Sequence, residues 1–542
     1  VQNLSFTNVG GGSVGFSSAV AGAPWLSVGN PPGAINGGEQ ATIPVTVYAG
    51  GLAPGYYSST VRTTTSAGVT VTPVTLYVSP APAMGLSSTG TQISFPSGGV
   101  PAGANSFTVG IASDTAVNWS ASVVSGADWL STSTPSGMAS NSTPGKVWFT
   151  VDPAKAAALS SGLYTGTIRV TSSQTANSPL DYDVLLNVWP STAPPAPVVS
   201  PDGVVLVTSA IASQNVTVAS NGAAAASYQA SGWTSDGSNW LTVRPSTDTV
   251  AAGATAASQI VVDPAGLPNG PYYGSVSYGF GSSATDSVNV TLIVVPTGSC
   301  TAAKTVPARV VMPNGFVSTV GRPTAMGIQL MDDCGQPLTS GWVTASFSNG
   351  DTSLSLTPIG NAAGLFTATW YPAHPAGQVS VTFWASSGAL APGSVQSTGI
   401  VMPANGPLIA PLSTLHIFAP QPGAALAPGT LVQISGLNLA AKAVNDSSTP
   451  QSTSLGNTSV TIGGLAVPLS AVGPAQISAQ VPFELAAEGQ YEVQVNNNGV
   501  LSPPDTIHVS AAAPGVQALS NGLVSAQHMS GGAVSEQAPA AP

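Results

Sequence analysis

The sequence predicts an all-β chain made of about five β-sandwich domains in tandem, and three observations carry this prediction. A Trp-Leu-Ser or Trp-Leu-Thr triplet begins at Trp25, Trp129 and Trp240, so it recurs about every hundred residues. That period is too long for a solenoid repeat and matches the size of a domain. Segments that alternate polar and apolar residues are typical of half-buried strands. Finally, 61 Gly and 47 Pro residues disfavour long helices.

Each triplet is followed by the same two features, which define a repeat. A Gly/Pro turn leads to a tyrosine, and an apolar strand then stops at a proline. We therefore expect these aromatic residues to anchor the core of each repeat: Trp25, Trp129, Trp240, Tyr57, Tyr164 and Tyr273.

The three repeats occupy residues 1–80, 84–190 and 198–296. Over forty residues of the second and third repeats precede Trp129 and Trp240, whereas only 24 residues precede Trp25. We therefore expect the first copy to lack one or two initial strands. Such a domain would have an unpaired sheet edge. Pro-rich segments separate the repeats, and we expect them to form extended polyproline II spacers between independent domains.

Two further domains and a tail complete the array. Residues 300–402 contain about seven short alternating segments, as in a β-sandwich. This domain also holds the only two cysteines, Cys300 and Cys334, for which we expect a disulfide. The fifth domain is predicted at residues 412–511, and a Gly/Ala/Ser/Pro-rich tail follows at 512–542.

The motifs of these domains resemble known bacterial modules. The Trp-Leu-Ser, Gly-Tyr and terminal-strand pattern resembles BACON-like domains of the immunoglobulin (Ig) type, and residues 300–402 resemble a bacterial Ig-like domain. The fifth domain is similar to the Solibacter-type C-terminal domain with a TIG-like sandwich, through Ala427-Pro428-Gly429 and Gly473-Pro474-Ala475-Gln476. These resemblances imply Ig-like sandwiches throughout the chain.

Composition excludes some classes of function. Only 5% of residues are charged and the formal net charge is -11, so clustered cations for binding nucleic acid are absent. No apolar run approaches the ~20 residues that span a bilayer. The scarcity of charge and the abundance of Ser, Thr and Asn favour a secreted protein at the cell surface.

No pattern of an active site is recognisable, so we expect no enzyme activity, no cofactor and no metal. The four histidines occur in separate segments: His374, His416, His508 and His528. Two acidic pairs, Asp181 with Asp183 and Asp332 with Asp333, are the candidates for calcium ligands, although each is short of the oxygen ligands that calcium needs. The cluster of Glu484, Glu488 and Glu492 fits a solvated loop better than a pair of glycosidase carboxylates.

The aromatic residues leave two alternatives open. Trp25, Trp129 and Trp240 are expected in the cores, but exposed tryptophans would form platforms for sugar rings, as the carbohydrate-binding role associated with BACON-like modules implies. Trp370, Tyr371 and Trp384 in the fourth domain carry the same ambiguity. Surface glycans are therefore the alternative partner.

The two ends of the chain lead to a specific hypothesis. A tail strand containing Leu523, Val524, Ala526 and Met529 could pair with the unpaired edge of the first domain in another copy. A head-to-tail contact of this kind that does not close produces a fibre. The sequence thus favours a secreted structural protein that self-associates into an extracellular filament or surface assembly. The alternatives are a carbohydrate-binding adhesin and the non-catalytic part of a larger secreted hydrolase.

Overall fold

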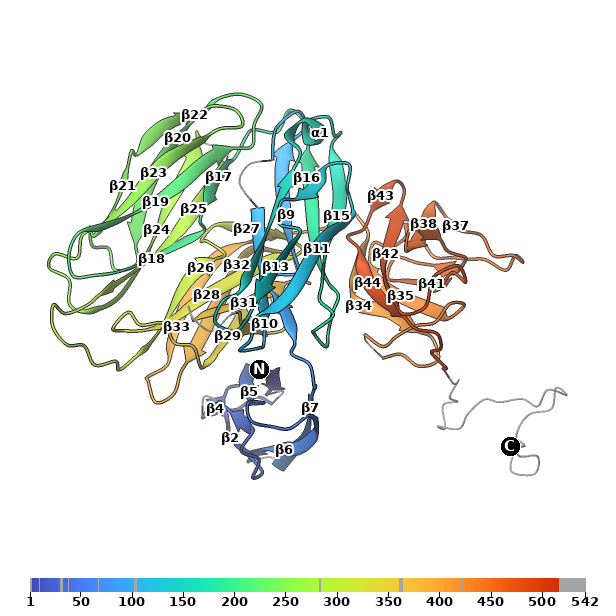
Figure 1. Ribbon diagram of the computed structural model, residues 1–542, viewed down its shortest axis with the longest axis horizontal. Helices are drawn as coiled ribbons and strands as arrows, with labels where there is room; N and C mark the ends of the chain where they lie inside the picture. The colour runs from blue at the N-terminus through green and yellow to red at the C-terminus, as the bar shows by residue number, and fades with distance from the viewer. Residues whose placement is uncertain are drawn as a thin grey trace. The chain divides into compact units, whose positions relative to one another are not determined.

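The computed structural model is built almost entirely of β-strands, as predicted (Figure 1). It describes residues 2–8, 10–29, 33–37, 39–66, 68–101, 105–281, 284–359, 364–404, 406–421 and 423–515. The chain divides into two compact units, residues 1–403 and 404–542. The short helix α1, Pro153–Ala157, is capped at its N-terminus by Asp152, whose carboxylate accepts hydrogen bonds from the backbone amides of Ala154 and Lys155. Nowhere in the described ranges is a helix both long and apolar enough to cross a membrane.

The second domain shows the complete sandwich of the repeats. Its strands are β8 (Met84–Leu86), β9 (Gly90–Pro96), β10 (Asn105–Ile111), β11 (Val117–Ser125), β12 (Leu130–Thr132), β13 (Ser136–Ala139), β14 (Gly145–Val151), β15 (Gly162–Thr171) and β16 (Leu180–Trp189). One sheet has the order β12-β14-β10-β8 and the other β13-β11-β15-β16-β9. Strict alternation of buried and exposed residues along β14 directs Val147, Phe149 and Val151 into the core.

The third domain repeats this arrangement strand for strand. Its strands are β17 (Pro197–Ser200), β18 (Gly203–Thr208), β19 (Ala212–Ser220), β20 (Ala226–Thr234), β21 (Leu241–Arg244), β22 (Thr247–Val250), β23 (Thr255–Val262), β24 (Gly270–Phe280) and β25 (Ala284–Val294). The sheets have the orders β17-β19-β23-β21 and β18-β25-β24-β20-β22. In both domains the second strand runs parallel to the last one, β9 beside β16 and β18 beside β25.

The first domain has the same path with two strands fewer. Its strands are β1 (Gln2–Thr7), β2 (Val14–Val20), β3 (Leu26–Val28), β4 (Ala34–Ile35), β5 (Gln40–Val47), β6 (Gly55–Thr65) and β7 (Gly68–Val78). The sheets are β1-β5-β3 and β4-β2-β6-β7, so β1 corresponds to β10 and β7 to β16. Residues 2–78 thus contain no counterpart of β8 or β9.

The fourth domain is a sandwich of a different order. Its strands are β26 (Thr305–Val311), β27 (Phe316–Thr319), β28 (Thr324–Asp332), β29 (Trp342–Phe347), β30 (Leu354–Pro358), β31 (Leu365–Trp370), β32 (Ala376–Ser386) and β33 (Gly393–Met402). They follow one path, β26-β28-β31-β30-β29-β32-β33-β27, because β30 pairs with β31 on one side and β29 on the other. The buried ring of Trp370 stacks on Phe347 in its core.

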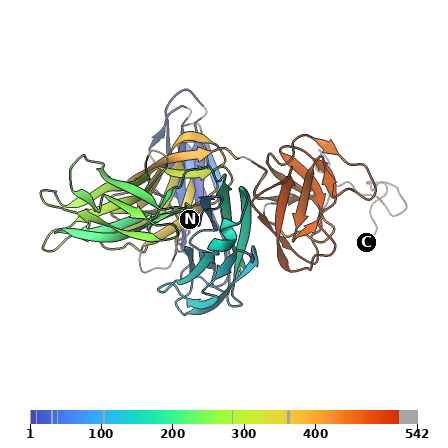
Figure 2. The same ribbon diagram turned by 90° about the horizontal axis from the view of Figure 1, so that it is seen from above.

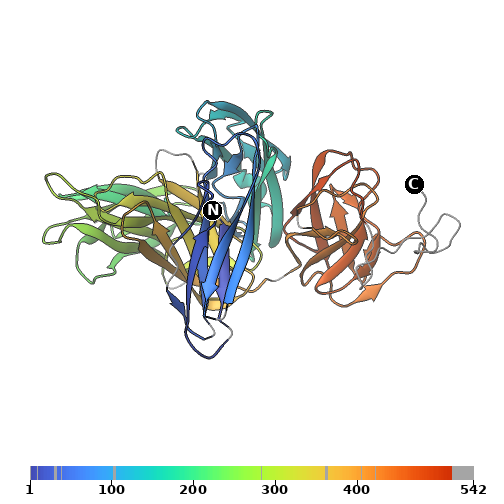
Figure 3. The same ribbon diagram turned by 90° about the horizontal axis from the view of Figure 1, so that it is seen from below.

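The four sandwiches of unit 1 contact one another, which differs from the predicted row of independent domains on polyproline spacers. Ile293 of the third domain shares a buried apolar cluster with Val306 and Met331 of the fourth. Strands β18 and β26 lie side by side there, in green and yellow (Figure 1). Figures 2 and 3 show the same two domains adjoining from two other sides.

The first and second domains also contact the fourth. The Thr89 amide donates to Thr369 Oγ1 over 2.8 Å, and the Thr89 hydroxyl is 2.9 Å from that of Tyr371. The Thr42 hydroxyl of the first domain donates to Ser353 Oγ over 3.3 Å. The fourth domain is therefore the centre of unit 1.

Unit 2 contains the fifth domain, another sandwich of two antiparallel sheets. Its strands are β34 (Leu408–His416), β35 (Leu431–Leu437), β36 (Val444–Asn445), β37 (Ser454–Leu455), β38 (Thr458–Ile462), β39 (Leu465–Ala466), β40 (Leu469–Val472), β41 (Gln476–Gln480), β42 (Gly489–Asn497), β43 (Val500–Leu501) and β44 (Asp505–Val509). One sheet has the order β34-β35-β41-β40-β36, and the other is built around β38 and β42. The domain begins before the predicted residue 412, because Leu408 at the start of β34 pairs with Leu437.

Candidate functional site

The three repeat tryptophans are buried and each touches a tyrosine or an apolar core. The ring of Trp25 makes an edge-to-face contact with the ring of Tyr57, and the ring of Trp240 makes the same contact with that of Tyr272. The two ring centroids are 6.3 Å apart in each pair. Trp129 lies in the core of the second domain, and Tyr164 packs against that core. Each tyrosine hydroxyl donates to the carbonyl four residues earlier, which fixes the turn before the strand: Tyr57 to Ala53, Tyr164 to Ser160 and Tyr272 to Pro268.

The third repeat therefore uses Tyr272, and the prediction of Tyr273 as its anchor was wrong. Side chains alternate along β24, so Tyr273 lies on the opposite face of the sheet from Tyr272. There Tyr273 packs against Ile293, Val306 and Met331 at the boundary with the fourth domain. Burial in this boundary raises the pKa of the Tyr273 phenol to about 12, although nearby Arg309 acts in the opposite direction.

The acidic pair Asp181 and Asp183 is occupied by its own strand neighbours. The two carboxylate oxygens of Asp181 accept hydrogen bonds from Nε and Nη2 of Arg169, each over 2.8 Å. The two side chains thus form a bidentate ion pair between β16 and β15. Asp183 accepts a hydrogen bond from the Thr167 hydroxyl over 3.0 Å. These contacts hold both carboxylates against the neighbouring strand.

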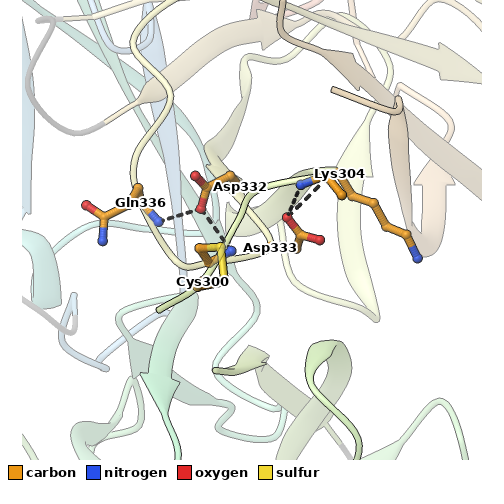
Figure 4. The surroundings of a disulfide bond; sticks show 7 residues. Cys300, Lys304, Asp332, Asp333 and Gln336 are labelled. Carbon is orange, nitrogen blue, oxygen red and sulfur yellow. Dashed lines mark hydrogen bonds between the residues drawn. A yellow bond between two sulfur atoms is a disulfide. The ribbon is translucent and has the colours of Figure 1, made fainter. Parts of the chain in front are cut away.

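Asp332 and Asp333 hold the turn around the disulfide (Figure 4). Cys300 and Cys334 are joined, with Cα atoms 5.7 Å apart. One oxygen of Asp332 accepts the amides of Cys334 and Gln336, and one of Asp333 accepts those of Ala303 and Lys304. Partial burial disfavours the charge of Asp333, but these amide hydrogen bonds outweigh it and lower the pKa of this carboxyl.

The histidines and glutamates do not come together. His374 Nδ1 lies 2.6 Å from Asp351, whose carboxylate also accepts the Trp370 indole N–H and the Ala373 amide, so Asp351 organises a loop. His416 Nδ1 accepts the Phe418 amide and His508 is exposed on β44, while His528 lies outside the described residues. Glu484 and Glu488 are exposed, and Glu492 lies within β42. Across the described ranges, no group of three or more His, Cys, Asp or Glu side chains could hold a metal ion.

The ambiguous aromatic residues of the fourth domain separate into three roles. Trp370 is buried. The hydroxyl of Tyr371 is hydrogen-bonded to the hydroxyl of Thr89 where the fourth domain contacts the second. Trp384 is 51% exposed on β32. Trp148 of the second domain is 41% exposed, and the Lys146 ammonium lies 4.3 Å from its ring centroid.

A polar cluster was missed from the sequence, and it joins the third and fourth domains. Buried Asn289 donates to Met312 O over 3.1 Å, and buried Arg309 donates to Asn314 and to the Gln396 carbonyl. Burial, reinforced by the charge of Asp286, raises the pKa of Asp202 to about 7. Burial also lowers the pKa of Arg309 to about 10. An Asn in a sequence rich in Asn and Ser gives no signal for such a role.

The edge of the first domain at β7 leaves part of an apolar core open to solvent. Within the described residues, β7 pairs with β6 on one side and has no strand on the other (Figure 1). In the second domain β9 fills this position, and Val184, Leu186 and Val188 of β16 are then 0%, 0% and 3% exposed. The corresponding Val74, Leu76 and Val78 of β7 are only half-buried. An apolar strip of the core thus reaches the surface at this edge.

The predicted donor residues cannot be placed, because Leu523, Val524, Ala526 and Met529 lie outside the described residues. The described chain ends at Gly515, which lies against the His416 ring.

Family models match both kinds of module that the sequence motifs resemble. Residues 1–76 and 199–292 match the viral BACON domain, and residues 416–509 match the IPT/TIG domain. The predicted BACON-like and TIG-like modules are thereby confirmed. No curated protein matches the chain.

Several solved structures of tandem domains are similar to this chain. Domains 4–9 of the surface layer protein SbsC are 15% identical, covering 94% of this chain and 74% of that chain, with a TM-score of 0.24. The eight N-terminal Ig domains of Down Syndrome Cell Adhesion Molecule are 11% identical, covering 86% and 60%, with a TM-score of 0.19. The D0-D1 domain of intimin is 13% identical, covering 39% and 97%, with a TM-score of 0.18.

Proposed function

We propose that this chain, which carries BACON-type domains in its N-terminal region and an IPT/TIG domain near its C-terminus, is a secreted structural protein. It would act at the cell surface as a subunit of an extracellular filament or surface assembly. The observation that carries this proposal is the construction of unit 1. Three sandwiches contact the fourth, the third through buried apolar and polar side chains and the first and second through hydrogen bonds nearer the surface. These contacts make a multi-domain building block out of modules that could otherwise move independently.

The chemistry of the chain supports an extracellular location. The Cys300–Cys334 disulfide persists in oxidising compartments and would be reduced in most cytosols. Only 5% of the residues are charged, so two copies can bring surfaces together without removing many ions from water.

The side chains that could have supported catalysis support a structural role instead. Asp181, Asp332, Asp333 and Asp351 each accept hydrogen bonds from nearby backbone or side-chain donors, and so they serve to fix strands and turns. A structural protein needs such fixed turns, whereas a catalytic carboxylate needs access to a substrate.

The proposal is tested with the purified chain at increasing concentration, by sedimentation velocity and negative-stain electron microscopy. A subunit of an assembly is expected to sediment as growing oligomers and to form regular fibres or sheets. A chain that remains monomeric at every concentration tested, with no ordered particles in the micrographs, would contradict it.

The exposed tryptophans favour carbohydrate binding as a second candidate function. Trp148 and Trp384 each lie on a strand face among small polar residues, and a flat aromatic ring beside hydroxyls suits a sugar ring. A glycan array probed with the full chain and with Trp148→Ala and Trp384→Ala variants tests this function. Loss of a glycan signal in either variant would support an adhesin, or the non-catalytic part of a larger secreted hydrolase.

A further inference from the structure

The junction between the third and fourth domains has an apolar half and a polar half. The apolar half is built from buried side chains of both domains: Ile293, Val306 and Met331. Beside them, Val207 of the third domain packs closely against Gly335 of the fourth. The bond between Cys300 and Cys334 fixes the linker of the two domains to the turn that contains Gly335. Apolar burial and a covalent bond thus close this half.

The polar half lies at the other end of β26 and centres on the loop between β26 and β27. The amide of Met312 donates to the Asp202 carboxyl, and the amide of Asn314 donates to Asn289 Oδ1 over 3.4 Å. Asn289 Nδ2 in turn donates to the Met312 carbonyl over 3.1 Å. Side chains of the third domain therefore hold this loop of the fourth, and the amides of Met312 and Asn314 report directly on whether the polar half is closed.

The backbone of the polar half is tightly constrained. Met312 is 2% exposed and has a φ of 68°, in the left-handed region that residues other than glycine seldom adopt. Gly203 of the third domain lies so close to the fourth that a Cβ atom on it would be 2.2 Å from the Arg309 carbonyl oxygen. A backbone held in such a conformation by its surroundings can relax when these contacts are released, which favours opening.

The charged groups of the polar half do not neutralise one another. Asp202 and Asp286 are both buried, and neither forms an ion pair within the described part of the chain. The guanidinium of Arg309 donates to Asn314 Oδ1 and to the Gln396 carbonyl instead of to a carboxylate. A carboxyl that is buried beside a second one, without a cation on it, favours its protonated form.

Asp202 is the group of the polar half that titrates near neutral pH. Burial, reinforced by the charge of Asp286, raises the pKa of Asp202 to about 7. Burial raises the pKa of the Tyr273 phenol to about 12 and lowers that of Arg309 to about 10, so neither changes charge between pH 5 and pH 8. Burial also raises the pKa of Asp286, although two backbone amides of its own domain donate to it and favour its charge.

We propose that the polar half is a pH-sensitive latch, which is closed when Asp202 is protonated and opens as the pH rises, while the apolar half and the disulfide keep the two domains joined. This proposal goes beyond the proposed assembly, because it concerns a single copy of the chain. In the open latch water reaches Asp202, whose pKa returns toward its ordinary value of about 3.9. The closed latch is therefore favoured most below about pH 4 and loses this advantage as the pH rises through about 7. These two pKa values predict that the equilibrium constant for opening rises roughly a hundredfold between pH 5 and pH 8.

Hydrogen exchange of the full chain, followed by mass spectrometry and corrected for the intrinsic rate at each pH, tests the latch. In the wild type, the Met312 and Asn314 amides should exchange roughly a hundredfold faster at pH 8 than at pH 5. Asp202→Asn cannot ionise but can still accept the Met312 amide, so its exchange should stay slow at pH 8. Asp248→Asn is the matched control, because Asp248 is exposed in the same domain, and it should respond like the wild type. A response that survives Asp202→Asn, or that the wild type lacks, would overturn the proposal.

A reference within the same chain separates opening of the latch from unfolding of the third domain. The amides of β19 and β23 lie in the other sheet of that domain, which does not contain β18 or β25. At pH 8 they should exchange far more slowly than the Met312 and Asn314 amides. Equal exchange would mean that the whole third domain unfolds, and the proposal would then be wrong.

Gly203→Ala tests the geometry of the latch without changing a titrating group. The added Cβ atom would clash with the Arg309 carbonyl oxygen, so the latch should already be open at pH 5. The Met312 and Asn314 amides of this variant should then exchange at pH 5 at least as fast as those of the wild type at pH 8. If they stay as slow as in the wild type at pH 5, the close approach at Gly203 does not hold the latch and the proposal fails.

Discussion

Trp240 and Trp233 belong to the same domain, but they lie in opposite environments. Trp240 is 3% exposed and its indole N–H donates to Asp236 over 3.3 Å, whereas Trp233 is 58% exposed. We expect Trp240→Ala to lower the free energy of unfolding of the third domain by about 3–5 kcal/mol, through lost burial and the cavity left behind. Trp233→Ala should change it by no more than about 0.5 kcal/mol.

Hydrogen exchange of the third-domain amides in the full chain measures this difference, because the multi-domain chain is not expected to unfold in one step. Similar losses of protection in the two variants would show that the repeat tryptophan is not the anchor of its core.

The aromatic anchors show how far residue identity can be predicted from a repeat. Trp25, Trp129 and Trp240 could be assigned because each is followed by the same apolar strand residues. The tyrosine of the third repeat could not, because Tyr272 and Tyr273 are adjacent and both fit the motif. Only the hydroxyl bond to Pro268 and the ring contact with Trp240 distinguish Tyr272.

Because the pKa of Asp202 is raised in the folded chain, we expect the stability of the third domain to fall as the pH rises. Burial and the charge of Asp286 raise its folded pKa to about 7, against an unfolded value near 3.9. The folded state therefore binds this proton more tightly, so the contribution to stability is full below pH ~4 and is lost by about pH 7. Asp202→Asn, which stays neutral, should stabilise the chain relative to wild type at pH 8 by about 2–4 kcal/mol, and hardly at pH 4.

Hydrogen exchange of the third-domain amides in both chains at pH 4, 6 and 8, corrected for the intrinsic exchange rate at each pH, checks this expectation. Asp286→Asn is the second variant, and it should reduce the loss of stability between pH 4 and 7 because one of the two causes is removed. A constant difference between wild type and Asp202→Asn across this range would show that Asp202 does not titrate there.

At the scale of elements, the disulfide and the two aspartates act on the same turn of the fourth domain. The bridge closes a loop of about 35 residues, which contributes about 4 kcal/mol in the chain-entropy account. The double variant Cys300→Ser, Cys334→Ser should therefore lose about that much stability in the fourth domain. The loss would be measured as a lower thermal unfolding temperature of this domain. Protection of amides in the fifth domain should be unchanged, and an equal loss there would contradict a local effect.

The strand count of the first domain could be predicted in outline from the sequence. Fewer residues precede Trp25 in this sequence than precede Trp129 or Trp240 within their repeats, and the described residues of the first domain contain no counterpart of β8 or β9. The parallel direction of β9 could not be predicted, because alternation of apolar residues along a strand carries no information on the direction of its neighbour.

At the scale of the whole molecule, the contacts between sandwiches were the feature that the sequence hid. Val207 of the third domain is 40% exposed, yet its methyl groups pack so closely against Gly335 of the fourth domain that a Cβ atom at Gly335 would clash with them. Val207 and Met331 look like ordinary strand residues, and the Pro-rich segments between domains favoured separation. Which strand faces touch is decided by the shapes of complete domains, and local periodicity does not encode them.

The contact between the third and fourth domains gives a direct test of this arrangement. Met331 is 4% exposed and packs with Val306 of its own domain and with Ile293 across the boundary. An aspartate at this position would bury a carboxylate with no cation among those two neighbours, at a cost of several kcal/mol, and the two domains are expected to separate. The segment between them, residues 295–304, would then be cut faster by a broad-specificity protease.

Val317→Asp is the matched control, because Val317 lies in the same domain and is 64% exposed. Limited proteolysis of the full chain, with the cut sites identified by mass spectrometry, should show faster cleavage at residues 295–304 in Met331→Asp only. If Met331→Asp were cut no faster than Val317→Asp while the fourth domain stayed folded, the apolar contact would not hold the two domains together. The joined unit 1 would then lose its support, and with it the main argument for a multi-domain building block.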